Sequence, residues 1–239
     1  MYKRQSKNED LILANATAPL QSAAAATTDI PILGTSVTDY ATALDISDWS
    51  GTTGRNISGT SDLAPLSEQA AMLNELFPDA KNVGLLYCSA EANSQYQIDV
   101  IKEELEKLNY TCTAYSFVDS NDIASVVQSA VNDNDVLYVP TDNTAASNTE
   151  VINNIAGEAG VPIIAGEAGI CKGCGVATLS ISYYDLGYQT GKMAYEILVN
   201  GADPSTMEVE FAPAVTKQYN PDICEKLGIT VPDDYKALD

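Results

Sequence analysis

The chain alternates short apolar runs with segments of helical period along most of its length. Each apolar run leads through a polar turn into a segment in which apolar residues recur three and four positions apart. Such alternation predicts an α/β fold, in which parallel strands are joined by right-handed crossovers through helices. The predicted strands are Leu11–Ala14, Pro31–Gly34, Val83–Tyr87, Thr111–Phe117, Val136–Val139, Val161–Ala165 and Ala177–Ile181, and two further segments, Glu208–Phe211 and Val215–Gln218, are predicted to be extended.

The segments between these strands have the apolar spacing of helices. Thr17 is placed to cap the first of them, with Pro19 in the first turn, where proline is tolerated. Residues 40–62 have no clear period and are rich in Gly, Thr, Ser and Asp. We interpret them as a long surface segment followed by a crossing between two lobes. The predicted helices are Leu20–Ala26, Ser67–Phe77, Gln95–Leu108, Thr144–Ala159, Asp185–Val199 and Pro221–Leu227.

Composition narrows the classes of function. The 239 residues carry a formal net charge of −21 and include no histidine. The charge argues against a nucleic-acid partner, because phosphate binding needs a positive field. The lack of histidine excludes Ser-His-Asp and Cys-His catalysis and His-ligated metal sites within this chain. Gly166–Gly169 lacks the spacing and the following helix start of a phosphate-binding fingerprint, so we expect neither a metal nor a cofactor.

Five cysteines leave the redox state of the chain open. Cys171 and Cys174 form a C-x-x-C pair in what looks like a Gly-rich loop. A disulfide, half of a zinc site and a redox pair are the three interpretations. The sequence shows no second pair for zinc, and a redox pair usually opens a helix. We expect a structural disulfide if the protein is exported and free thiols if it is not.

Polar side chains follow several predicted strands at the point where each strand ends. In the clearest case, Val136–Val139 runs into Pro140, which has no N–H for a strand ladder, and then into three polar residues. Neighbouring parallel strands end at the same edge of a sheet, where α/β proteins bind ligands. The polar strand exits are Asn15–Thr17, Thr35–Ser36, Ser89–Ser94, Thr141–Asn143 and Gly166–Glu167.

Several spaced motifs agree, in order, with those of a known family. They are Gly54–Asp62, Phe77–Tyr87, Glu91–Ser94, Ser182–Gly187, Asn220–Pro221 and Leu227–Ile229. With these motifs the chain resembles the ABC-transporter substrate-binding proteins related to tryptophan- and phenylalanine-binding lipoproteins, which have the type I periplasmic-binding-protein fold. The resemblance covers residues 8–235. The Cys171–Cys174 segment and the surroundings of Trp49 depart from the family pattern.

The resemblance implies two Rossmann-like lobes with parallel sheets and helices on both faces, joined by a hinge, with a ligand between them. By that comparison residues 6–60 and 183–204 form the first lobe, and residues 61–182 and 205–239 form the second. Family members begin with a further strand, helix and strand behind a lipoprotein signal. Met1–Gln5 also matches translation through a sequencing adapter. We therefore expect a truncated N-terminus and an incomplete first lobe.

The resemblance also implies a function. We expect a non-enzymatic, extracytoplasmic solute-binding component of an ABC importer, which is a periplasmic or cell-surface lipoprotein. It would bind a small aromatic or aliphatic amino acid, deliver it to the permease, and contact the membrane only through a lipid anchor missing from this chain. The alternative is the ligand-sensing module of a receptor or transcription regulator with the same fold. A sugar hydrolase that uses Asp142 and Glu167 as an acid–base pair is a weaker hypothesis, because nothing singles these two residues out.

An amino acid ligand needs two opposite anchors. Its carboxylate suits hydroxyl groups and free N–H groups at helix N-termini, and its ammonium suits a buried carboxylate. Our first choice for the ammonium is Asp142, followed by Glu167 and Asp185. The candidate ligand-binding residues are Asn15, Thr17, Thr35, Ser36, Ser89, Glu91, Asn93, Ser94, Thr141, Asp142, Asn143, Glu167, Tyr183 and Asp185.

Each candidate also has a structural interpretation. Ser94 and Asp185 could simply cap helices, and Glu91 resembles a solvated loop acid. Aromatic side chains could stack on an aromatic ligand, but they more often fill cores, since each buries a large apolar area. Tyr183 is the best aromatic candidate because it follows a strand at a predicted crossing. The others are Tyr40, Trp49 and Tyr184.

Overall fold

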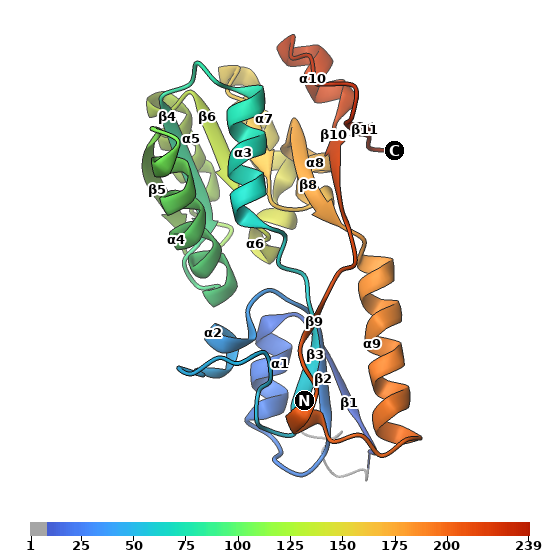
Figure 1. Ribbon diagram of the computed structural model, residues 1–239. Coiled ribbons are helices and arrows are strands. Elements are labelled where there is room, and N and C mark those ends of the chain that lie inside the picture. The colour runs from blue at the N-terminus through green and yellow to red at the C-terminus, as the bar shows by residue number, and fades with distance from the viewer. Residues whose placement is uncertain (1–8) are drawn as a thin grey trace. The chain divides into compact units, whose positions relative to one another are not determined.

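The structure is a computed structural model that describes residues 9–239 (Figure 1). Met1–Gln5, interpreted above as an adapter remnant, and residues 6–8 of the predicted first lobe lie outside the described residues. The described chain divides into two compact units. The first unit comprises the described residues up to Leu63 together with Ser182–Ala214, and the second comprises Ala64–Ile181 and Val215–Asp239.

The first unit is built on a parallel four-stranded sheet. Its elements are β1 (Ile12–Asn15), α1 (Thr17–Ala24), β2 (Ile32–Val37), α2 (Tyr40–Leu44), β3 (Ile57–Ser61), α9 (Tyr183–Leu198), the 3-10 helix η1 (Pro204–Thr206) and β9 (Glu210–Phe211). The strand order is β1-β2-β3-β9. Alternate side chains point to opposite faces of the sheet. Ile32 accordingly packs with α1 and α2 on one face, whereas Leu33 packs with Met193 and Ile197 of α9 on the other.

Residues 40–62 are not the irregular surface segment that we predicted. They form α2 and β3, and all five residues of β3 are buried. β3 has the sequence Ile-Ser-Gly-Thr-Ser, so its single large apolar side chain gives almost no strand signal. Its polar groups find partners inside the unit. The hydroxyls of Thr35, Thr60 and Thr190 lie 2.8 to 3.3 Å from one another and form a hydrogen-bonded triangle.

The last crossing between the units lies later in the chain than predicted. Residues 205–214 belong to the first unit, not to the second. β9 pairs in parallel with the end of β3, and Ser58 Oγ donates hydrogen bonds to the carbonyl oxygens of Met207 and Glu208 at 3.0 and 3.3 Å. The extended segment predicted over Glu208–Phe211 contains β9, but its pairing with β3, which places it in the first unit, leaves no signal in the local apolar pattern.

The second unit is built on a seven-stranded sheet. Its elements are α3 (Leu66–Leu76), β4 (Asn82–Cys88), α4 (Ala92–Lys107), β5 (Thr111–Phe117), α5 (Ile123–Asp133), β6 (Val136–Val139), α6 (Asn143–Ala146), α7 (Thr149–Ala159), β7 (Ile163–Ala165), α8 (Ala168–Cys174), β8 (Ala177–Ile181), β10 (Val215–Tyr219), α10 (Pro221–Leu227) and β11 (Lys236–Ala237). The strand order is β11-β10-β8-β7-β6-β4-β5. β4 to β8 are parallel, and β10 runs antiparallel to β8.

Helices cover both faces of this sheet (Figure 1). Leu86, Leu137 and Val139 face α5, α6, α7 and α8 in one buried cluster. On the opposite face, the hydroxyl of Tyr138 donates to Gln69 Oε1 of α3 at 2.6 Å. The α/β class with parallel sheets and helices on both faces is therefore confirmed. Among the helices of residues 9–239, none is long and apolar enough to cross a membrane.

Three local predictions were wrong. Thr17 does not cap α1, because Ala16 occupies the N-cap position and Thr17 is the first helical residue. The helix predicted over Thr144–Ala159 is two helices, α6 and α7. The C-x-x-C pair lies in α8 and not in a loop, so a helix does begin after Gly166 and Glu167. All five cysteines are free thiols.

Gly59 of β3 provides a test of close packing in the first unit. Its φ is +148°, and a Cβ at this position would lie 2.1 Å from the carbonyl oxygen of Gly34 and 2.3 Å from the hydroxyl of Tyr40. We expect Gly59→Ala to lower the free energy of unfolding by about 1–3 kcal/mol, because the neighbouring backbone must move. Urea denaturation followed by circular dichroism measures this change.

The matched control is Gly187→Ala in α9, where an added Cβ meets nothing within 4 Å. This variant should gain about 0.5–1 kcal/mol, since alanine is the better helix former. Equal effects of the two substitutions would contradict the close approach of β3 to β2.

Candidate functional site

Three polar strand exits meet at one edge of the second unit. β4 pairs with β6, and β6 pairs with β7, so the carboxyl ends of these strands lie side by side. The order β5-β4-β6-β7-β8 changes direction between β4 and β6, and such a switch point is where open α/β sheets bind ligands. The exits Ser89–Ser94, Thr141–Asn143 and Gly166–Glu167 therefore converge as the sequence indicated.

Asp142 connects these exits. Its side chain is 1% exposed and caps α6, where Oδ1 accepts the N–H of Ala145 at 2.8 Å. Oδ2 accepts the N–H of Cys88, the last residue of β4, at 2.7 Å. The Ser94 side chain adds a third hydrogen bond. One carboxylate thus joins the end of β4 to the first turns of α4 and α6.

Burial raises the pKa of Asp142 above its ordinary value, and the nearby Glu91 carboxylate raises it further, against the effect of the hydrogen bonds. Both oxygens of Asp142 already accept hydrogen bonds from the protein. Its assignment as the direct partner of a ligand ammonium stays a prediction. The contacts describe a residue that holds the β6–α6 turn in place.

Glu91 is not the solvated loop acid that we predicted. Oε2 accepts the N–H and Nδ2 of Asn143 at 3.1 and 2.8 Å, and Oε1 accepts the N–H and hydroxyl of Thr144 at 2.9 and 2.7 Å. Burial alone would raise the pKa of Glu91, but the hydrogen bonds outweigh it and hold the pKa below its ordinary value. Glu91 therefore closes the β4–α4 turn onto the first turn of α6.

Sequence reasoning missed Gln97. Its Oε1 accepts the N–H of Thr141 at 3.0 Å, and its Nε2 donates to the carbonyl of Thr141 at 2.9 Å. Asn93 Nδ2 donates to the same carbonyl at 3.2 Å. A signal was available, because Ser94 and Gln97 share one stripe of α4 with the buried Ile98. Polar side chains on a buried stripe need hydrogen-bond partners.

The third exit is held in a similar way. The carboxylate of Glu167 caps α8 by accepting the N–H groups of Ile170 and, at 2.6 Å, Gly169. The carbonyl of Gly166 accepts Nε2 of the buried Gln69 at 3.1 Å. A Cβ at Gly166 would lie 2.6 Å from the backbone nitrogen of Thr141. Glycine therefore allows the two strand exits to approach each other.

Exposed groups remain at this edge. Ser89 and Asn143 are exposed, and Thr141 is partly exposed. Ser89 Oγ donates to the carbonyl of Phe117 at 3.2 Å. The hydroxyl of Thr141 makes a long contact of 3.5 Å with the carbonyl of Gly166. A hydroxyl that donates one hydrogen bond can still accept others, so these side chains retain capacity for a ligand.

The first unit also gathers predicted residues at the carboxyl edge of its sheet. Asn15 ends β1, Thr17 begins α1, and Thr35 and Ser36 lie near the end of β2. Ala16, with φ 81° and ψ 165°, and Ser36, with φ 53°, adopt backbone conformations that L side chains rarely take. Backbone strain of this kind concentrates at functional sites.

Tyr183 and Asp185 lie in the first turn of α9. The hydroxyl of Tyr183 donates to Asp62 Oδ2 at 3.2 Å. Ser182 is the N-cap of α9 and accepts the N–H of Asp185 at 3.2 Å, so Asp185 is not the cap. Its exposed carboxylate lies near the positive end of the helix.

The other aromatic candidates differ in their surroundings. Tyr40 is fully buried in the core of the first unit, which excludes it as a stacking surface, and its hydroxyl donates to the carbonyl of Thr60 at 3.2 Å. Trp49 and Tyr184 are both exposed, at 38% and 80%. Within the described part of the chain, no three His, Cys, Asp or Glu side chains are grouped so that they could hold a metal ion.

Comparison with known proteins agrees with these features. The family model for ABC transporter substrate binding proteins matches residues 2–238. The chain belongs to this family. It is 37% identical over 193 residues to a tyrosine-binding protein of Clostridioides difficile (strain R20291), in an alignment that covers 81% of this chain and 56% of that protein. The chain thus spans about half the length of this curated relative.

Solved structures of family members have the same fold. The ABC domain from Streptococcus pneumoniae in complex with L-Trp has a TM-score of 0.91 at 31% identity, covering 98% of this chain and 82% of that one. The ligand-free, open structure of a substrate-binding protein with adhesive properties from Clostridium difficile has a TM-score of 0.75 at 36% identity, covering 99% and 80%. The family resemblance seen in the sequence is confirmed.

The Glu91 contacts predict a pH-dependent stability. A carboxyl whose folded pKa is lowered stabilises the fold above its unfolded pKa of about 4.3, and this contribution is lost as the pH falls through the folded pKa. We expect Glu91→Gln to cost about 1 kcal/mol of unfolding free energy at pH 7, a figure that allows for partial exposure. The cost should be smaller at pH 3 than at pH 7, because a larger fraction of the parent carboxyl is protonated at the lower pH.

Urea denaturation at the two pH values measures the difference between variant and parent. Glu103→Gln is a matched control, because Glu103 is an exposed acid on α4, the helix that follows Glu91. A cost for Glu91→Gln that persists unchanged at the lower pH would contradict the assignment.

Proposed function

We propose that this protein is the solute-binding component of an ABC importer and that its ligand is a small aromatic α-amino acid. Relatives at 31% and 37% identity support the ligand class, since one is a complex with L-Trp and the other is a tyrosine-binding protein. The observation that carries the proposal is the convergence of three polar strand exits at the switch point of the second unit. This edge supplies hydroxyl and amide groups suited to binding without covalent chemistry.

Serine and threonine hydroxyls are the proposed partners of the ligand carboxylate. Ser89 and Thr141 supply them in the second unit, and Thr17, Thr35 and Ser36 are further candidates in the first. Hydroxyls and main-chain N–H groups near strand exits can bind the ligand carboxylate through hydrogen bonds from neutral donors, so the protein does not need to bury a positively charged side chain beside it. Asn15, Asn93 and Asn143 supply amide groups beside them.

The ammonium needs an acid that can still accept a hydrogen bond. Asp142 is buried with both oxygens engaged, and Glu91 accepts four hydrogen bonds from Asn143 and Thr144. The carboxylate of Glu167 also accepts N–H groups from Gly169 and Ile170, but Glu167 is partly exposed, and Asp185 is exposed. Because both acids are open to solvent, we place the ammonium contact on Asp185 or Glu167, and we assign the buried Asp142 to positioning the turn.

Calorimetry on the whole chain tests the ligand class. Tyrosine, tryptophan, phenylalanine and leucine are titrated beside two tyrosine analogues, tyramine, which lacks the carboxylate, and 3-(4-hydroxyphenyl)propionate, which lacks the ammonium. We expect saturable binding of the aromatic amino acids and at least about tenfold weaker binding of both analogues, because each loses a charge-assisted hydrogen bond. If no amino acid binds, the proposed ligand class is wrong.

The same analogues separate a direct ammonium contact from a positioning role. Glu167→Gln or Asp185→Asn should weaken tyrosine binding about tenfold or more and leave the deaminated analogue unchanged. Asp142→Asn should weaken the binding of tyrosine and of the deaminated analogue by the same factor. The reason is that Asp142 positions the β6–α6 turn, through its hydrogen bonds with Cys88 and Ser94, and does not contact the ammonium. Selective loss of tyrosine in Asp142→Asn would instead make Asp142 the ammonium anchor.

We further propose that the partner is the permease of an ABC importer and that the protein works on the extracytoplasmic side, attached through a lipid anchor. Family membership supports the first two points. A ligand-sensing module of a receptor or regulator is the weaker alternative. A LacI-family transcriptional regulator from Bifidobacterium animalis shares the fold with a TM-score of 0.60, but at 12% identity it supports nothing more specific.

A further inference from the structure

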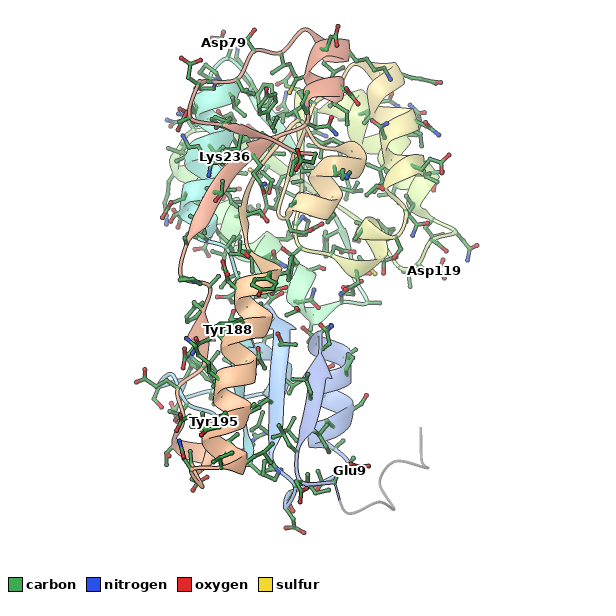
Figure 2. All side chains as sticks on the ribbon, turned by 90° about the vertical axis from the view of Figure 1, so that its right-hand side faces the viewer. Glu9, Asp79, Asp119, Tyr188, Tyr195 and Lys236 are labelled. Carbon is green, nitrogen blue, oxygen red and sulfur yellow. The ribbon has the colours of Figure 1, made fainter. Side chains whose placement is uncertain are left out.

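Two buried glutamines bind the main chain at the carboxyl edge of the second unit. Gln69 lies in α3 and Gln97 in α4, and they are 1% and 2% exposed. An amide side chain that is taken out of water needs partners for its two N–H donors and its oxygen. In Figure 2 the carboxyl edge of this unit's sheet is on the side of Asp119, which follows β5, and the opposite edge is on the side of Asp79, which precedes β4.

Gln69 binds the exit of β7. Its Nε2 donates to the carbonyls of Gly166 and Leu179 at 3.1 and 3.0 Å, and its Oε1 accepts the hydroxyl of Tyr138 at 2.6 Å. Carbonyls only accept hydrogen bonds, so Nε2 must face them and the Tyr138 hydroxyl must donate. Burial raises the pKa of Tyr138, so this hydroxyl keeps its proton. The amide therefore has a single orientation, in which it joins Gly166 to β8.

Gln97 binds the exit of β6 in the same way. Its Nε2 donates to the carbonyls of Thr141 and Asn93 at 2.9 and 3.1 Å, and its Oε1 accepts the N–H of Thr141 at 3.0 Å. Two of the three hydrogen bonds thus hold the main chain of one residue. Among the hydrogen bonds of residues 9–239, neither glutamine reaches the exit that the other one holds.

The two exits present different chemical groups to a ligand. The β6 exit carries the hydroxyl of Thr141, a proposed partner of the ligand carboxylate, and the β7 exit carries the carboxylate of Glu167. The exits are adjacent, since a Cβ at Gly166 would lie 2.6 Å from the backbone nitrogen of Thr141. The carboxylate and the ammonium of an α-amino acid are attached to the same carbon, so their protein partners must be neighbours. Thr141 and Glu167 meet this condition within one unit.

We propose that Gln69 and Gln97 are positioning residues that act on different halves of one ligand site. Gln69 holds Gly166 and so places the next residue, Glu167, for the ligand ammonium. Gln97 holds Thr141, whose hydroxyl binds the ligand carboxylate. Neither glutamine touches the ligand, because both are buried with their N–H groups and oxygen engaged by the protein. This inference rests on the proposed function, and of the two acids named there it places the ammonium contact on Glu167.

Substitution of each glutamine by methionine tests this division. Methionine is similar to glutamine in length and volume but has no N–H donor, so each variant leaves one set of main-chain groups without its partner. Tyrosine, tyramine and 3-(4-hydroxyphenyl)propionate are titrated by calorimetry into the parent chain and into each variant. The quantity compared is the factor by which a variant raises the dissociation constant of each ligand.

The two variants should give opposite patterns. Gln69→Met should raise the dissociation constants of tyrosine and tyramine, which carry the ammonium, about tenfold or more and change that of the deaminated analogue by less than about twofold. Gln97→Met should weaken tyrosine and the deaminated analogue, which carry the carboxylate, and leave tyramine unchanged. Tyr138→Phe should repeat the pattern of Gln69→Met with smaller factors, because Nε2 of Gln69 keeps both of its carbonyl partners.

Urea denaturation measures the stability of each variant, and Val127→Ala is the control for a loss of stability alone. Val127 is buried in α5, on the face of the sheet opposite α3. Its variant should be less stable than the parent chain and keep all three dissociation constants. If a methionine variant does not fold, Tyr138→Phe replaces it for Gln69. Gln97→Glu, which keeps the acceptor for the Thr141 N–H, replaces it for Gln97.

Equal factors for all three ligands in either variant would overturn the proposal, because a purely structural role cannot distinguish an ammonium from a carboxylate. Dissociation constants that neither variant changes would also overturn it. In both cases the parent chain still binds tyrosine, so the proposed function stands and only this inference fails. A parent chain that binds no amino acid overturns the proposed function and this inference together.

Discussion

The need to satisfy main-chain groups where parallel strands end controls the architecture of the second unit. Strands β4, β6 and β7 stop at one edge, and the turns beyond them expose N–H and C=O groups that no neighbouring strand can pair. Side chains provide the partners. Asp142 receives the N–H groups of Cys88 and Ala145, Glu91 receives those of Asn143 and Thr144, and Gln97 pairs with both main-chain groups of Thr141. Removing any one of them leaves buried donors or acceptors without a partner.

This requirement changes how acidic residues at such an edge should be interpreted. Asp142 and Glu91 resemble ligand anchors in the sequence, but both carboxylates close the first turn of α6. The pKa values of the two carboxyls also shift in opposite directions. The pKa of Asp142 is raised by burial and by Glu91, whereas hydrogen bonds lower the pKa of Glu91 against its own burial. The groups with remaining hydrogen-bonding capacity at this edge are hydroxyls, amides and the more exposed acids.

In the first unit, buried polar residues of a strand are hydrogen-bonded mainly by other hydroxyl side chains. β3 is buried although four of its five residues are polar or glycine. The threonine hydroxyls on β2, β3 and α9 satisfy one another, and Gly59 lets the backbone of β3 approach Gly34 closely. The same physical demand, that buried polar groups find partners, thus acts in both units, through carboxylates and amides in the second and through hydroxyls in the first.

The sequence by itself determined the features that depend on local apolar pattern. The bounds of β5, β6, β8 and α10, the α/β class and the convergence of the three polar exits all follow from residues close together in the chain. Tertiary structure decided the rest. β3 was hidden because its burial depends on hydroxyl partners. β9 lies in a segment predicted to be extended, but its place in the first unit depends on its pairing with β3. The role of Glu91 depends on Asn143 and Thr144, which lie more than fifty positions further on. The sequence around a carboxylate does not show whether it will bind a helix N-terminus or a ligand, because that depends on which distant main-chain groups the fold places beside it.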